Sequence, residues 1–144
     1  MSKDQDTTPY VDALLEFAQS DPGRFNVPGH QGGIGADSSL HLLAGQTGLA
    51  DDIPALLEGI DVGNPNPFQE AQDLAAEAWG AKRTWFLING ASQGNQAMCL
   101  AVAHMGGELV VQRNVHSSVI DGMIMAGLKP TFAAPELDPE LGVA

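Results

Sequence analysis

Hydrophobic and polar positions along the second half of the chain indicate strands and helices in turn. Short apolar runs typical of strands cover 84–88, 108–112 and 130–133. Helical spacing of apolar residues covers 67–79, 93–105 and 116–126, and a glycine follows each of these segments. Strands that alternate with helices are typical of a parallel sheet built from right-handed βαβ units. The pattern therefore predicts an α/β fold with three parallel strands.

The first half of the chain is less regular. Residues 1–8 form a polar tail, and Thr8-Pro9 opens a helix that Asp21-Pro22-Gly23 ends. Residues 34–66 are rich in glycine and proline, which predicts irregular chain with one or two short helices. We therefore expect an N-terminal helical and irregular arm over 1–66 and the first part of a large α/β domain over 67–144. Three parallel strands would leave unpaired edges and a thin core, so this domain is expected to be incomplete, as in a fragment.

Composition narrows the class of protein. The 144 residues suffice for one domain, and 44% of them are hydrophobic, which is enough for a core. The net charge of -12 disfavours binding to nucleic acids or anionic membranes, since both need clustered Lys and Arg. The polar N-terminus does not resemble a signal peptide, and no apolar run has the length of a membrane span. The single cysteine, Cys99, is expected in the core. We expect a soluble, cytoplasmic protein.

The first candidate for chemistry follows the run at 84–88. The chain passes through Asn89-Gly90 and the small or polar residues Ala91, Ser92 and Gln93, and then takes up helical spacing. The first N–H groups of a helix have no partner inside it, so such a helix start can bind phosphate. An ordinary strand-to-helix turn with a polar cap would show the same pattern. A second segment, Arg113-Asn114-Val115-His116-Ser117-Ser118, precedes the next predicted helix.

Four segments in order carry a family resemblance. They are Val27-Pro28-Gly29-His30-Gln31-Gly32-Gly33, Gln69-Glu70-Ala71-Gln72-Asp73-Leu74-Ala75-Ala76-Glu77, the stretch from Phe86 to Ala97, and Arg113-Asn114-Val115-His116-Ser117-Ser118. Together they resemble the opening of the ornithine/lysine/arginine decarboxylases. These are pyridoxal-phosphate enzymes (lyases of amino-acid metabolism) with the aspartate-aminotransferase, or type I, fold. The resemblance runs from about Thr8 to the last residue.

The resemblance implies roles for particular residues. Ala91, through its backbone, together with Ser92 and Gln93, would bind the phosphate of pyridoxal phosphate. His116 would lie flat against the pyridine ring and take part in catalysis. The sequence departs from the family at Ala91 and Gln93, where hydroxyl residues are common, and at Ser117, where lysine is common. Without the resemblance, His116 would be interpreted as a helix-capping or half-buried histidine.

Other histidines have weaker claims. His30 resembles a family signature near the active-site entrance, although a turn histidine satisfied by backbone groups is an equal alternative. His41 and His104 have no neighbours at the spacing of metal ligands, so no metal site is expected.

The chain has no lysine in the frame that the family uses for its Schiff base. Its lysines are Lys3, Lys82 and Lys129, and none follows a Ser-x-His segment. The resemblance therefore implies the N-terminal portion of a basic amino-acid decarboxylase that is inactive alone. The complete enzyme would act on a small-molecule substrate, a basic amino acid, and form a homodimer or a higher oligomer.

Three alternatives remain open at this stage. Another type I enzyme, such as an aminotransferase or a carbon–sulfur lyase, would share the phosphate turn and the stacked histidine. A non-catalytic remnant or split subunit would bind a partner chain. A nucleotide-binding α/β domain is a third, although the sequence lacks both a Gly-x-Gly-x-x-Gly turn and a Walker lysine.

Overall fold

A computed structural model describes residues 4–143, and the chain divides into two compact units. The first unit extends to Trp85 and the second begins at Phe86. The predicted boundary after residue 66, between an N-terminal arm and an α/β domain, rests on the change in sequence pattern there. It stays a prediction. Among residues 4–143, no helix has both the length and the apolar character needed to cross a membrane.

The first unit is built around two helices that begin with proline. Helix α1 (Pro9–Gln19) confirms the predicted N-terminal helix, and α3 (Pro67–Ala78) confirms the predicted helix over 67–79 to within one residue. The Asn66 side chain accepts a hydrogen bond from the Gln69 N–H at 2.8 Å, which caps α3. Helix α1 lies against α3, and the Tyr10 and Phe68 rings meet edge to face with their centres 5.4 Å apart.

A short 3₁₀ turn, η1 (Gln31–Gly33), and helix α2 (Ser38–Ala50) form the rest of the regular structure in this unit. Gly45 has non-helical angles (φ 68°, ψ 165°), which divide α2 into two short pieces. The expectation of one or two short helices within 34–66 is therefore confirmed. The Gln46 side chain donates a hydrogen bond to the Gly32 carbonyl at 2.9 Å, and the His41 ring lies 2.9 Å from the Gly33 carbonyl. These contacts hold α2 against η1.

Asp37 caps α2 and gives a pH-dependent prediction. The Ser39 hydroxyl and then the Ser39 backbone N–H donate to its carboxylate, and both lower the pKa of Asp37. Ser39→Ala is expected to move the pKa of Asp37 back toward the ordinary aspartate value. Because the folded-state pKa is the lower one, the cap stabilises α2 above the unfolded-state pKa. That stabilisation is lost as the pH falls through the folded-state pKa. Carboxyl-carbon NMR titration of both proteins measures the change, and equal titration curves would contradict it.

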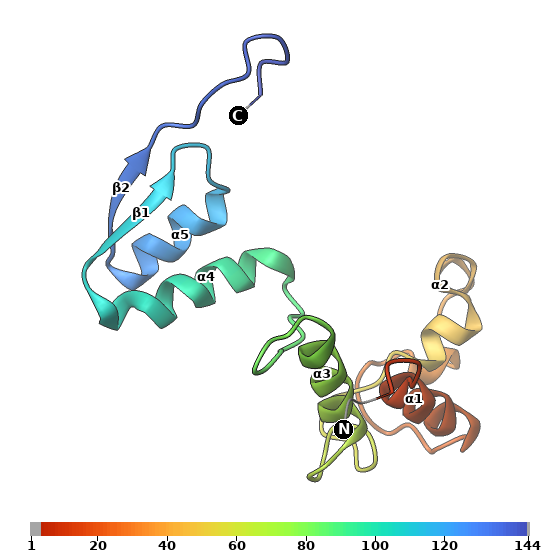
Figure 1. The fold of residues 1–144 in the computed structure, drawn as a ribbon. Helices are drawn as coiled ribbons and strands as arrows, with labels where there is room; N and C mark the ends of the chain where they lie inside the picture. Colours follow the sequence, from red (N-terminus) through yellow and green to blue (C-terminus); the bar gives the residue numbers. More distant parts are fainter. Residues whose placement is uncertain (1–3, 144) are drawn as a thin grey trace. The chain divides into compact units, whose positions relative to one another are not determined.

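The second unit is a small α/β arrangement (Figure 1). Its elements are, in order, α4 (Gly90–Val102), η2 (Ala103–Met105), β1 (Glu108–Gln112), α5 (Ser117–Ala126) and β2 (Lys129–Ala133). Strands β1 and β2 are parallel, with Glu108 beside Lys129 and Gln112 beside Ala133. The predicted strand at 108–112 is confirmed, and the strand at 130–133 is confirmed with one added residue. The predicted helix over 116–126 is α5, with His116 as its N-cap.

One face of this sheet carries the core of the unit. Cys99, Val119, Met123 and Leu128 are buried together, and alternate residues of β1, Leu109 and Val111, lie against them. Between these two, Val110 points to the other face and is 71% exposed. The alternation explains why β1 could be recognised from its sequence. Apolar burial of this kind stabilises the unit by about 25 cal/mol for each Å² removed from water.

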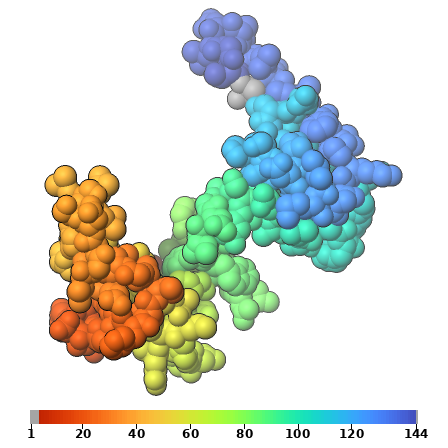
Figure 2. Space-filling model, turned by 180° about the vertical axis from the view of Figure 1, so that it is seen from behind, coloured from red at the N-terminus to blue at the C-terminus, as the bar shows by residue number. Residues whose placement is uncertain are grey.

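Helices α4 and α5 lie side by side, and the space-filling view from behind shows their atoms in contact (Figures 1 and 2). Contacts advance together along the two helices, from Asn95 with Ser118 to Cys99 with Gly122. The helices therefore run in the same direction. A Cβ placed on Gly122 would lie 3.0 Å from the Cys99 side chain and 3.0 Å from the Gln96 Cα, so any larger residue would require one of the two helices to shift.

The predicted strand at 84–88 is wrong. The structure assigns no strand to these residues, and Ile88 is 93% exposed. A segment forms a strand only when the backbone of a neighbouring strand makes hydrogen bonds with it. The sheet among the described residues contains β1 and β2 alone. The predicted three-stranded sheet is accordingly a two-stranded one in residues 4–143. The apolar composition of residues 84–88 favours a strand, but composition does not show whether a partner strand is present.

Candidate functional site

The first candidate is the N-terminus of α4. The helix begins at Gly90, three positions before the predicted start at Gln93, so Ala91 and Ser92 lie in its first turn and not in the turn before it. Gly90 has a φ of 67°, which glycine adopts without strain, and it turns the chain into the helix. The Gln93 side chain accepts a hydrogen bond from the Asn89 N–H at 3.1 Å. This local contact explains the earlier start and already occupies the Gln93 amide oxygen.

The N-terminus of α4 has hydrogen-bond donors that could bind an anion. The N–H groups of the first turn precede every carbonyl that could accept them inside the helix, and the positive end of the helix dipole lies there. Ala91 and Ser92 are exposed, so their backbone N–H groups and the Ser92 hydroxyl can reach a ligand. Gln93 is half-buried and takes the capping contact. Of the three predicted phosphate-binding residues, Ala91 and Ser92 are the ones that offer exposed donors in the first turn of the helix.

The second candidate is His116, at the N-terminus of α5. Its backbone is extended (φ -60°, ψ 144°), and its Nδ1 accepts a hydrogen bond from the Ser118 N–H at 3.2 Å. The same Nδ1 lies 2.8 Å from the Ser118 hydroxyl oxygen. The imidazole is exposed to solvent, whereas Ser118 is only 3% exposed. His116 is therefore a capping residue whose ring is exposed to solvent.

A hydrogen bond joins the two helices that carry the candidates. The Asn95 side-chain amide, in the second turn of α4, donates to the Ser118 hydroxyl at 2.8 Å. His116 thus lies near the start of α4 as well as at the start of α5. Both positions are at the carboxyl end of β1, since α5 follows β1 and α4 runs in the direction of α5. In open α/β sheets, ligands bind at the carboxyl ends of the strands.

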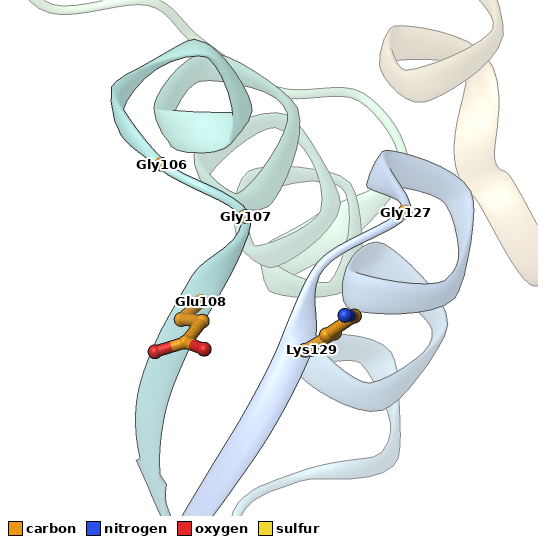
Figure 3. A pocket seen from close by; sticks show the side chains of 5 residues that line it. All are labelled: Gly106, Gly107, Glu108, Gly127 and Lys129. Atoms are coloured by element: carbon orange, nitrogen blue, oxygen red, sulfur yellow. The ribbon is translucent and has the colours of Figure 1, made fainter.

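A shallow pocket at the other end of the sheet is a weaker candidate. Gly106, Gly107, Glu108, Gly127 and Lys129 line it at the amino ends of the two strands (Figure 3). Its two charged side chains have opposite signs and come from directly paired positions, Glu108 and Lys129. This end of a parallel sheet is not where α/β proteins place their ligands. We therefore assign no function to it.

His30 lies in the first unit, and its Nε2 is 3.0 Å from a carboxylate oxygen of Asp52, so a side chain and not a backbone group contacts this nitrogen. Its Nδ1 is buried without a hydrogen-bond partner among the described residues, and its place near an active-site entrance stays a prediction. Within residues 4–143, no three or more His, Cys, Asp or Glu side chains gather as metal ligands would.

Comparison with known proteins decides the family. Residues 8–144 match the family described as "Orn/Lys/Arg decarboxylase, major domain". The chain belongs to this family. It is 40% identical to an arginine decarboxylase of Bacillus cereus, over 95% of the chain and 30% of that protein. An arginine decarboxylase of Bacillus subtilis is 36% identical, over 97% of the chain and 29% of the relative. Lysine decarboxylase LdcA of Pseudomonas aeruginosa is 32% identical, over 94% of the chain and 19% of the relative.

The family match confirms the resemblance drawn from the four segments. The chain spans about a third or less of the length of these curated relatives. Its mixed α/β architecture with a small parallel sheet fits part of the family's major domain. The roles of Ala91, Ser92, Gln93 and His116 stay predictions.

Sequence reasoning missed two residues that the structure places at the site, Asn95 and Ser118. A partial signal existed for each. Asn95 follows Ala91 by four residues and so shares its helix face, and Ser118 follows a capping position by two. Neither spacing shows that the two side chains meet, because that depends on how α4 and α5 are aligned.

Proposed function

We propose that the chain is the N-terminal portion of a pyridoxal-phosphate-dependent decarboxylase of a basic amino acid, with the type I fold. The observation that supports this most directly is the Asn95–Ser118 hydrogen bond, which joins helices α4 and α5 close to their N-termini. One carries Ser92 and the other carries His116, within a chain that belongs to the family. The proposed fold and the cytoplasmic location rest on the family resemblance and the sequence.

The residues present fit the cofactor. The exposed first turn of α4 offers backbone N–H groups and the Ser92 hydroxyl, which suit a phosphate ester. The exposed His116 ring has one edge fixed by Ser118 and leaves a flat face for an aromatic ring. Pyridoxal phosphate supplies an electron sink for the carbanion left when CO2 departs from Cα. In this proposal Ala91 and Ser92 bind the phosphate, Gln93 shapes the turn, and His116 orients the ring.

The chain alone is proposed to be inactive. Lys82 and Lys129 do not stand in the Ser-x-His frame of the family's Schiff-base lysine, and Lys3 precedes the described residues. The catalytic unit would therefore be a longer protein, active as a homodimer or a higher oligomer. Its substrate would be arginine, lysine or ornithine, since relatives are named as arginine and lysine decarboxylases. The strongly acidic chain is compatible with attraction of such cationic substrates.

The test is to read the native gene beyond codon 144 and to express its whole reading frame. We expect a downstream Ser-x-His-Lys segment, bound cofactor absorbance in the purified protein, and CO2 release from at least one of the three basic amino acids. Transamination without CO2 release would instead indicate another type I enzyme. A stop codon after Ala144 would favour the non-catalytic alternative, which binding of a complementary downstream fragment would then support.

A further inference from the structure

Three hydrogen bonds around His116 define where its ring proton lies. A backbone N–H can only donate, so the Ser118 N–H contact at 3.2 Å requires an unprotonated Nδ1. The Ser118 hydroxyl, 2.8 Å from the same nitrogen, must then donate to it as well. The hydroxyl has one proton, so its oxygen is left to accept from Asn95. The neutral ring therefore carries its proton on Nε2.

The direction of the whole relay follows from Asn95. Its side-chain Nδ2 lies 2.8 Å from the Ser118 oxygen and can only donate. Protons thus point from Asn95 to Ser118 and from Ser118 to His116. Ser118 is 3% exposed, so water does not compete strongly for its hydroxyl. The exposed end of the relay is the imidazole, whose faces and Nε2–H remain available.

We propose that Ser118 is a positioning residue that fixes the tautomer and the ring orientation of His116, and that Asn95, by donating to the Ser118 oxygen, keeps the Ser118 hydroxyl proton directed at His116. This inference rests on the proposed function, since it assigns the purpose of the fixed ring to cofactor stacking. The Nδ1 lone pair lies in the ring plane, so two donors aimed at it restrict rotation of the imidazole. A ring fixed before the ligand arrives avoids an ordering cost on binding. The relay also connects the phosphate-binding helix α4 to the stacking residue on α5.

The sharpest test changes the direction of one hydrogen bond. Asn95→Asp has almost the same shape but replaces the donor by an acceptor, so the Ser118 hydroxyl turns toward the new carboxylate and away from His116. Ser118→Ala removes the hydroxyl altogether. Asn95→Ala is the matched control, because Ser118 can still donate to Nδ1 there. Nitrogen NMR of isotope-labelled histidine rings, at alkaline pH where imidazoles are neutral, reads the tautomer directly without any cofactor. The signals that disappear from the spectrum of His116→Asn are those of His116.

We expect a single Nε2–H tautomer for His116 in the wild type and in Asn95→Ala. In Asn95→Asp and Ser118→Ala we expect a mixture of tautomers, because the shorter hydroxyl contact at 2.8 Å is lost and the backbone contact at 3.2 Å alone holds the ring too weakly. Unchanged signals from His104, which lies in the same compact unit as His116, would show that this unit is folded in each variant. A wild-type mixture, or the same single tautomer in all four proteins, would overturn the proposal. A purely structural role for the relay predicts lower stability with no change of tautomer.

The two proposals can fail separately. In the complete enzyme, Ser118→Ala is expected to weaken cofactor binding by about threefold to tenfold, the typical effect of one hydrogen bond. If the tautomer shifts as expected but no His116 variant alters cofactor binding, the proposed function falls and the relay stands as a device that orients the ring. If His116 variants weaken cofactor binding while the tautomer never shifts, the positioning role falls and the proposed function stands.

Discussion

His116→Ala in the complete enzyme is expected to weaken cofactor binding roughly tenfold and to lower kcat by about a hundredfold. Under the proposed function, the first effect follows from loss of a stacked aromatic face, since such contacts contribute about 0.5–1.5 kcal/mol beyond buried area. The second follows from loss of ring orientation, because small misplacements of reacting groups cost about that factor in rate. Equilibrium dialysis of the cofactor and steady-state CO2 release measure the two effects.

Two further variants separate stacking from helix capping, since His116 also accepts from the Ser118 N–H. His116→Asn keeps a good N-cap but has no aromatic face, so it should retain stability and lose cofactor affinity as His116→Ala does. His116→Phe keeps an aromatic face but cannot cap, so it should retain much of the affinity and lose about 1 kcal/mol of stability. Normal cofactor binding and rate in His116→Asn would show that the ring does not stack.

The sequence predicted the elements whose stabilising partners are close along the chain. Strand β1 alternates buried and exposed residues and pairs with β2, the next strand, through one intervening helix. Helix α3 carries its own start signal, because Asn66 caps it and proline occupies its first turn. In both cases the local sequence pattern favours the structure that the tertiary contacts also stabilise. The pattern alone was therefore sufficient to predict the element.

Prediction failed where a contact decides the outcome. The run at 84–88 has the composition of a strand, but no ladder among the described residues includes it. The start of α4 was placed three residues late because Gly90 was interpreted as part of a turn, whereas it directs the chain into the helix. The candidate site likewise has a part that a short segment predicts and a part that depends on tertiary contacts. His116 could be singled out from its segment, but its relay to Asn95 depends on the alignment of two helices, which no short segment specifies.

Gly122→Val is expected to destabilise the second unit by about 3 kcal/mol, the upper end of the usual cost of overpacking. A Cβ at Gly122 would lie 3.0 Å from both the Cys99 side chain and the Gln96 Cα. Rotation of the Cys99 side chain cannot relieve this overlap, because its Cβ is fixed by the backbone and its Sγ could turn only into a filled core, and the Gln96 Cα is itself backbone. The valine methyl groups add to this overlap, so α5 must move away from α4. Gly122→Ala should show an intermediate loss, because alanine regains about 1 kcal/mol through its helix propensity.

Cys99 supplies the measurement, because it is the single cysteine of the chain and it is fully buried in this unit. A thiol reagent can reach it only when the helix pair opens, so the labelling rate under native conditions reports the free energy of opening. A loss of about 3 kcal/mol corresponds to labelling that is roughly a hundredfold faster. Gly48→Ala is the control, since a Cβ there would meet only the Ala44 Cβ at 3.9 Å. It should leave labelling of Cys99 unchanged. If Gly122→Val also leaves the labelling rate unchanged, then the close approach of α4 and α5 does not hold this unit together.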